Sequence, residues 1–177
     1  MKLFFSPTSP YVRKVMACAH ELGVADRITL LPSNAHPVTR DAGIIAHNPL
    51  GKVPTLITDD GLVLYDSRVI CEWLDATHNG HLFPRQGAAR WQALVLQSLA
   101  DGMLDAALLA RYEEAARPEA LRWADWQHGQ LDKVNTALRS LEGAPAQLNE
   151  RADIGTLALG CALGYLDLRF DAWGWRG

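Results

Sequence analysis

The pattern of apolar residues changes near residue 80, and this change limits the folds that the chain can adopt. Before it, short apolar runs that are typical of strands alternate with stretches whose apolar residues recur at helical spacing. After it, no segment has the pattern of a strand, and the remaining sequence predicts helices only. The expected strands are residues 2–5, 28–31, 55–57 and 62–65, and the expected helices before the change are residues 11–22, a short irregular one near 40–46, and 68–77.

The order β-α-β-α-β-β-α predicts an α/β domain with a thioredoxin-like fold over residues 1–79. Gly80, Pro84 and Gly87 then indicate a linker. Residues 87–177 predict an all-α domain. Its helices are expected over 88–116, from Pro118 to near 141, and over 154–168. The first carries five large apolar residues at helical spacing: Trp91, Val95, Leu99, Met103 and Leu108. The third is capped by Asp153 and Thr156 and is apolar all round, so we expect it in a core.

Composition excludes several classes of function. The net charge is −3 and no basic run occurs, so we expect no nucleic-acid partner. The longest apolar stretch, residues 154–166, is shorter than the roughly 20 residues that span a bilayer. The start of the chain lacks the apolar core of a signal peptide. We therefore expect no membrane association.

The three cysteines, Cys18, Cys71 and Cys161, are widely spaced and lie in apolar helical contexts. This arrangement favours reduced, buried thiols in a cytoplasmic protein over a disulfide framework. No CxxC motif and no paired Cys/His spacing occurs, so the sequence predicts no metal site.

Three segments are more specific than the order of elements: residues 8–14 (TSPYVRK), 48–54 (NPLGKVP) and 65–67 (YDS). Together with the helical second half, they resemble the glutathione S-transferase family, and in particular its bacterial members with Ser or Thr at the start of the first helix. Residues 160–167 (GCALGYLD) resemble the central helix of the same subgroup. The resemblance covers essentially the whole chain and implies glutathione as co-substrate, a small electrophile as second substrate, and a homodimer.

Ser9 is the candidate catalytic residue. Ser9 followed by Pro10 is typical of a helix N-cap and first helical position. Its oxygen can accept a helix N–H while its hydroxyl hydrogen donates to the thiolate of glutathione. The alternative is that Ser9 is only a cap. Ser6 and Tyr11 are reserve candidates.

Val53 and Pro54 resemble the cis-proline element of the family, in which the Val53 N–H and C=O would pair with glutathione as an added strand does. The alternative is an ordinary trans proline at the start of an edge strand. At the next helix start, Ser67 could bind the γ-glutamyl carboxylate and Asp66 the γ-glutamyl ammonium. The alternative for this pair is a plain helix cap.

For the glycine carboxylate of glutathione, Lys52 is a candidate, with His36 and Arg40 as weaker ones. Asp101 and Asp105 lie four residues apart and share a helix face. In the family this helix lines the ligand cleft and the dimer seam, so the resemblance implies that Asp101 reaches glutathione, from its own or the partner subunit. The alternative is two solvated acids.

The resemblance further implies that Arg111 and Tyr112 border the electrophile site. It implies a reaction in which glutathione thiolate attacks a small electrophile. A glutathione-dependent disulfide reductase or peroxidase, and a non-enzymatic glutathione-binding or scaffold protein, remain the alternatives. Family members usually continue beyond the segment at residues 173–176, which leaves open that the helical domain is truncated at Gly177.

Overall fold

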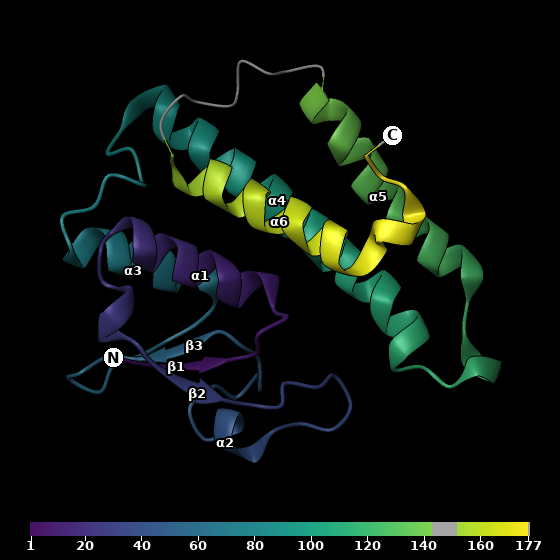
Figure 1. Ribbon diagram of the computed structural model, residues 1–177, viewed down its shortest axis with the longest axis horizontal. Coiled ribbons are helices and arrows are strands. Elements are labelled where there is room, and N and C mark those ends of the chain that lie inside the picture. Colours follow the sequence, from purple (N-terminus) through teal and green to yellow (C-terminus); the bar gives the residue numbers. More distant parts are fainter. Residues whose placement is uncertain (143–151, 177) are drawn as a thin grey trace. The chain divides into compact units, whose positions relative to one another are not determined.

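The computed structural model of the chain describes residues 1–142 and 152–176 (Figure 1). The chain forms two compact units, Met1–Phe83 (unit 1) and Pro84–Gly177 (unit 2). Unit 1 contains the strands and unit 2 contains helices and helical turns. The chain end at Gly177 lies outside the described residues.

Unit 1 is built on a four-stranded mixed sheet of order β2-β1-β3-β4. β1 pairs with β2 in parallel and with β3 antiparallel, and β3 pairs with β4 antiparallel. The four predicted strands are confirmed, with β2 displaced by one residue and β4 shorter than expected. The strands are β1 (Lys2–Phe5), β2 (Thr29–Pro32), β3 (Thr55–Ile57) and β4 (Val63–Leu64).

Three helices surround this sheet: α1 (Pro10–Glu21), α2 (Ala42–Ile45) and α3 (Ser67–Thr77). α1 and α3 lie together on one face of the sheet and α2 lies on the other (Figure 1). The core between the sheet and α1 and α3 is fully buried and apolar. This arrangement confirms the predicted thioredoxin-like α/β fold. The core includes Leu3, Val15, Cys18, Leu56, Ile70, Cys71 and Leu74.

In its described residues, unit 2 has three long helices, α4 (Gly87–Ala115), α5 (Ala124–Glu142) and α6 (Ile154–Phe170), and two helical turns, Glu119–Leu121 and Asp171–Trp173. α4 packs along both α5 and α6. The prediction that the second helix of this domain, which corresponds to α5, begins at Pro118 is wrong. Pro118 has extended backbone (φ −53°, ψ 137°), a single turn follows, and α5 begins at Ala124.

The face that α4 buries differs from the expected one. Of the five large residues expected on its apolar stripe, Met103 is buried, whereas Trp91 is 65% and Val95 68% exposed. The buried face is mostly small, which lets the neighbouring helix backbones approach closely. It includes Ala93, Leu96, Ala100, Met103, Leu104, Ala107 and Ala110.

Among the described residues, α4 alone is long and apolar enough to cross a bilayer, judged by length and composition. In its most apolar window 56% of the helix is buried inside the fold, as in the core helix of a globular protein. α6 begins with the predicted capping box: Thr156 N donates to Asp153 Oδ1 and Asp153 N donates to Thr156 Oγ1, each at 2.9 Å. Its predicted place in the core is confirmed by Ile154, Ala158 and Ala162, which are fully buried.

Candidate functional site

The loops that carry most of the candidate residues leave the sheet of unit 1 at one edge. Phe5 at the end of β1 pairs with Pro32 at the end of the parallel strand β2. Thr55 at the start of β3 pairs with Phe4, and Leu64 at the end of β4 pairs with Leu56. The register therefore brings together the ends of β1, β2 and β4 and the start of β3. The segments next to these ends contain Ser9, His36, Lys52, Val53, Pro54, Asp66 and Ser67.

Ser9 is the N-cap of α1, as predicted. Its Oγ accepts a 3.3 Å hydrogen bond from Val12 N, and its own N–H donates to Ser6 O at 3.1 Å. The side chain is half-buried. Within residues 1–142 and 152–176 its hydroxyl hydrogen has no acceptor. The hydroxyl can therefore donate to an incoming anion without giving up the cap, and its role toward a thiolate stays a prediction.

The loop before β3 is held by the buried side chain of Asn48. Its Nδ2 donates to Lys52 O at 3.2 Å and to Thr55 Oγ1 at 2.9 Å, and its Oδ1 accepts from Leu50 N at 3.0 Å. Thr55 Oγ1 in turn donates to Lys52 O at 2.8 Å. Sequence reasoning assigned no role to Asn48 or Thr55. The only signal for their positioning role was the presence of Asn48 within the NPLGKVP segment.

The peptide bond between Val53 and Pro54 is cis, which confirms that prediction; the Tyr65–Asp66 bond is cis as well. Val53 is half-buried and lies just before β3. In the described part of the chain, neither its N–H nor its C=O has a hydrogen-bond partner. These two groups at a strand end can pair with the backbone of a short peptide in the manner of an added strand.

Asp66 caps α3, and Ser67 is the first residue of that helix. Asp66 is exposed and its Oδ1 accepts from Arg68 N at 2.9 Å, so the residue is a helix cap, and its contact with a γ-glutamyl ammonium stays a prediction. Ser67 is 2% exposed, and its hydroxyl has no hydrogen bond to another described residue. The cap leaves the second carboxylate oxygen of Asp66 and the Ser67 hydroxyl available. A ligand with an ammonium and a carboxylate group can use both.

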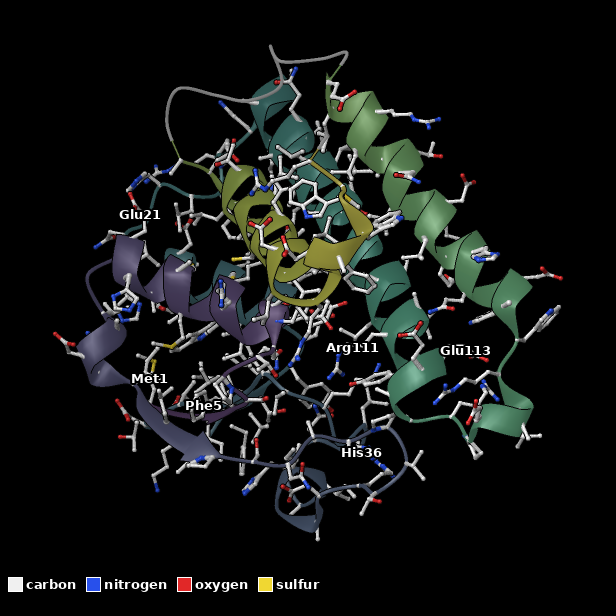
Figure 2. All side chains as sticks on the ribbon, turned by 45° about the vertical axis from the view of Figure 1, so that its right-hand side comes forward. Met1, Phe5, Glu21, His36, Arg111 and Glu113 are labelled. Carbon is white, nitrogen blue, oxygen red and sulfur yellow. The ribbon has the colours of Figure 1, made fainter. Side chains whose placement is uncertain are left out.

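His36 lies on the loop that follows β2 (Figure 2). It is exposed, and its Nδ1 accepts from Val38 N at 3.2 Å and Thr39 N at 3.1 Å, so a neutral ring carries its proton on Nε2. Asp41 closes this loop by accepting from Asn34 N at 2.9 Å. That hydrogen bond lowers the pKa of Asp41.

Lys52 and Arg40 occupy different settings. The Lys52 side chain is exposed, whereas its carbonyl is part of the Asn48 network. The Arg40 guanidinium donates to the carbonyl of Pro49 and therefore supports the same loop. The structure thus gives Arg40 a positioning contact. The predicted contact of Lys52 with a glycine carboxylate stays a prediction.

Asp101 belongs to unit 2, on α4. It is 1% exposed, so the alternative of a solvated acid is wrong for Asp101, although Asp105 is exposed. Both residues interact with other groups of the protein. The predicted contact of Asp101 with glutathione stays a prediction. Arg111 and Tyr112 are half-buried near the end of α4.

The cysteines are not part of this site. Cys18, Cys71 and Cys161 are buried and form no disulfide within the described residues, as predicted. Across residues 1–142 and 152–176, no group of three His, Cys, Asp or Glu side chains is arranged to hold a metal ion.

Comparison with known proteins gives a consistent result. Residues 8–77 match the family model of the glutathione S-transferase N-terminal domain. The chain is 37% identical over 180 residues to YibF of Escherichia coli K12, described as an uncharacterized GST-like protein, with 99% of this chain and 86% of that protein covered.

Two solved structures are similar over nearly the whole chain. One is a glutathione transferase family member from Pseudomonas fluorescens Pf-5 (TM-score 0.96, 50% identity, 99% of this chain and 86% of that one). The other is a glutathione S-transferase from Methylobacillus flagellatus KT (TM-score 0.86, 39% identity, 97% and 85% covered). The fold, the junctions at one sheet edge and the sequence similarity over 99% of the chain agree: the chain belongs to the glutathione S-transferase family.

Proposed function

We propose that this chain is a glutathione transferase that conjugates the thiolate of glutathione to a small electrophile. The proposal rests on one observation. Three segments next to strand ends, at Ser9, Val53 and Asp66–Ser67, lie at the same edge of the sheet, and each has hydrogen-bonding groups that are not used within the described residues. These groups are the Ser9 hydroxyl, the Val53 N–H and C=O, and the Ser67 hydroxyl beside the Asp66 carboxylate.

The binding mode follows from the chemistry of each group. The cysteinyl backbone of glutathione pairs with Val53 before Pro54. Its γ-glutamyl carboxylate takes the Ser67 hydroxyl and the N-terminus of α3, and its ammonium takes the Asp66 carboxylate. Lys52, with His36 as a second candidate, faces the glycine carboxylate. Asp101 is a further candidate contact with glutathione.

The chemical step requires a thiolate, because the thiolate is the nucleophile. A free thiol of this type has a pKa of about 8.5, so its ionisation at neutral pH needs stabilisation of the anion. The Ser9 hydroxyl donates a hydrogen bond to the sulfur, and the N-terminus of α1 adds a favourable partial charge. With an activated aryl chloride, the sulfur forms the new carbon–sulfur bond and chloride leaves with the electron pair of the broken bond.

Similar proteins support the choice of ligand. The Pf-5 and M. flagellatus structures hold bound glutathione. Another Pf-5 structure, 48% identical to this chain, holds S-(propanoic acid)-glutathione. That molecule is a thioether of glutathione, the product class of the proposed reaction.

We propose a cytoplasmic homodimer as the working form. Three buried cysteines that form no disulfide in the described residues fit a reducing compartment. Trp91 and Val95 are exposed on α4. Beside them a groove of about 480 Å³ lies between α4 and α5, lined by Val95, Ser98, Leu99, Gly102, Met103, Lys133 and Ala137. An apolar surface of this kind on a soluble protein marks an interaction site.

The decisive experiment measures turnover of the purified chain with glutathione and each of three second substrates: an activated aryl chloride, a small disulfide and a hydroperoxide. We expect displacement of chloride to be the fastest reaction. Faster reduction of the disulfide or peroxide would reverse the assignment. Retention on immobilised glutathione with no turnover of any of the three would identify a binding protein instead.

A further inference from the structure

Two arginines and two tyrosines gather where α4 packs along α6 in unit 2. We call them the arginine–tyrosine cluster: Arg111 and Tyr112 on α4, and Tyr165 and Arg169 on α6. Tyr165 and Arg169 are four residues apart, so they share one face of α6. Packing of α4 along α6 supplies the other two side chains.

Tyr165 is 4% exposed, but within the described ranges its hydroxyl has no hydrogen-bond partner. The hydroxyl oxygen is not among the buried unpaired atoms of the described residues, so it keeps access to solvent and to a ligand. Burial raises the pKa of Tyr165, while the positive charges of Arg111 and Arg169 act in the opposite direction. Arg111 on α4 and Arg169 on α6 therefore both favour an anion at this place, where the two helices pack.

Within residues 1–142 and 152–176, the guanidinium groups of Arg111 and Arg169 have no ion pair and no hydrogen bond. The neighbouring acids are already engaged. Glu113 pairs with Arg117 at 2.8 Å, and Asp167 pairs with Arg176 at 2.8 Å. Figure 2 shows Arg111 and Glu113 on opposite sides of α4, as expected for two residues separated by about 200° around a helix.

Aromatic rings continue from Tyr165 toward the end of the chain. The Phe170 ring lies edge-on to Tyr165 with a centroid distance of 6.4 Å, and the Trp173 ring lies edge-on to Phe170 at 6.3 Å. The Tyr165 ring thus joins the cationic groups that act on its hydroxyl to an apolar, aromatic surface. The two surfaces together suit an anionic group attached to a flat apolar body.

We propose that the arginine–tyrosine cluster binds a small organic carboxylate. A guanidinium presents parallel N–H groups that match the two oxygens of a carboxylate, and the Tyr165 hydroxyl supplies a further donor. The carboxylate can belong to the electrophile that reacts with glutathione or to an acid that is not a substrate. Only the first of these two sources rests on the proposed function; the anion site itself does not.

The test measures equilibrium binding of benzoate and of its neutral analogue benzamide, followed by tryptophan fluorescence and by calorimetry. We expect benzoate to bind at least about tenfold more tightly, because benzamide lacks the charge that the two guanidinium groups recognise. Benzoate binding should weaken as ionic strength rises. Equal affinity for the two compounds overturns the proposal.

Three variants locate the site. Arg111→Gln, Arg169→Gln and Tyr165→Phe should each weaken benzoate binding, the arginine changes by about tenfold, and should leave benzamide binding unchanged. Arg139→Gln is the matched control, since it removes one positive charge from exposed residue 139 near the end of α5. Its benzoate affinity should equal that of the unmodified chain. Benzoate affinity that is unchanged in all three cluster variants overturns the proposal.

A second arm distinguishes the sources of the carboxylate. Turnover is compared for 4-chloro-3-nitrobenzoate and 4-chloro-3-nitrobenzamide in the unmodified chain and in Arg111→Gln. A rise in KM for the acid alone assigns the site to the acidic electrophile. If Arg111→Gln loses benzoate binding but the ratio of the KM values for the acid and the amide is unchanged, the site binds an acid that is not a substrate. Benzoate binding without turnover of either compound supports the anion site and contradicts the proposed transferase function.

Discussion

Gly155 on α6 lies against the backbone of Ala93 on α4. A Cβ atom at position 155 would lie 2.7 Å from the Ala93 carbonyl oxygen and 2.9 Å from Leu96 Cβ. We predict that Gly155→Ala lowers the free energy of unfolding of unit 2 by about 1–3 kcal/mol, because two packed helices must move apart. Urea denaturation followed by circular dichroism measures the change.

Gly160→Ala on the same helix is the matched control. Gly160 is exposed, and a Cβ there meets nothing within 4 Å. This change should raise the free energy of unfolding by about 0.5–1 kcal/mol, because alanine is the better helix former. A Gly155→Ala protein as stable as Gly160→Ala would contradict the close approach of the two helices.

Ser9→Ala removes the hydroxyl donor at the start of α1. If the hydroxyl stabilises a thiolate, the thiol pKa of bound glutathione rises toward its free value of about 8.5. The value of kcat/KM at neutral pH then falls roughly 10–100-fold, because each pKa unit is a tenfold change in thiolate population. Ser9→Thr keeps a hydroxyl and should keep most of the activity. Ultraviolet titration of the bound thiol measures the pKa directly.

Because Ser9 is also a helix cap, the loss of the cap needs its own control. Asp153→Ala removes the cap of α6 and should lower the free energy of unfolding by about 0.5–2 kcal/mol. It should leave the thiol pKa of bound glutathione unchanged. An equal pKa shift in Ser9→Ala and Asp153→Ala would show that stability, and not the hydroxyl, governs the thiol.

Val95→Glu places a charge on the exposed apolar surface of α4. Val95 is 68% exposed, so the change should not unfold a monomer. If the working form is a homodimer through this surface, light scattering should show conversion to the monomer. Leu121→Glu is the control, because Leu121 is 65% exposed but lies in the turn after α4. Dimers that survive Val95→Glu would place the interface elsewhere.

Glu113 makes the stability of unit 2 depend on pH. Its Oε1 accepts a 2.7 Å hydrogen bond from Trp123 N and pairs with Arg117. The hydrogen bond from Trp123 is the main cause of a pKa below the ordinary 4.5, with Arg117 and Arg122 contributing. A lowered folded-state pKa means that this stabilisation is complete above pH 4.5 and is lost as the pH falls through the folded-state value.

Glu113→Gln should therefore be less stable than the unmodified chain at neutral pH, and the difference should shrink as the pH falls below 4.5. Glu114→Gln is the control, because Glu114 is exposed and its carboxylate, within the described residues, accepts only from the Gln127 side chain. Urea denaturation at a series of pH values measures both. A difference between Glu113→Gln and the unmodified chain that stays constant down to low pH would contradict the role of Trp123.

The parts of the fold that depend on local sequence could be predicted. The caps at Ser9, Asp66 and Asp153 were found because a capping side chain bonds to backbone within three residues of itself. The strand order was not predictable by the same means, since pairing of β1 with β3 joins residues about fifty positions apart.

The buried face of α4 shows why features that depend on tertiary packing could not be predicted from the sequence. The helical spacing of large residues such as Trp91 and Val95 predicts that they are buried, but α5 and α6 pack closely against the alanine-rich face instead. The arginine–tyrosine cluster has a related origin, because Arg111 and Tyr165 meet only through packing of α4 along α6. Asn48 was missed as a positioning residue because its partners, Lys52 and Thr55, are chosen by the folded loop.

Ser9 and Asp66 each cap a helix of unit 1 as well as belonging to the candidate site. Selection for folding alone would retain both side chains after the chemistry had been lost. Relatives without transferase activity are therefore expected to keep these two residues. Substitutions that accompany a loss of activity should appear first at positions that do not cap a helix, such as Ser67 and Lys52.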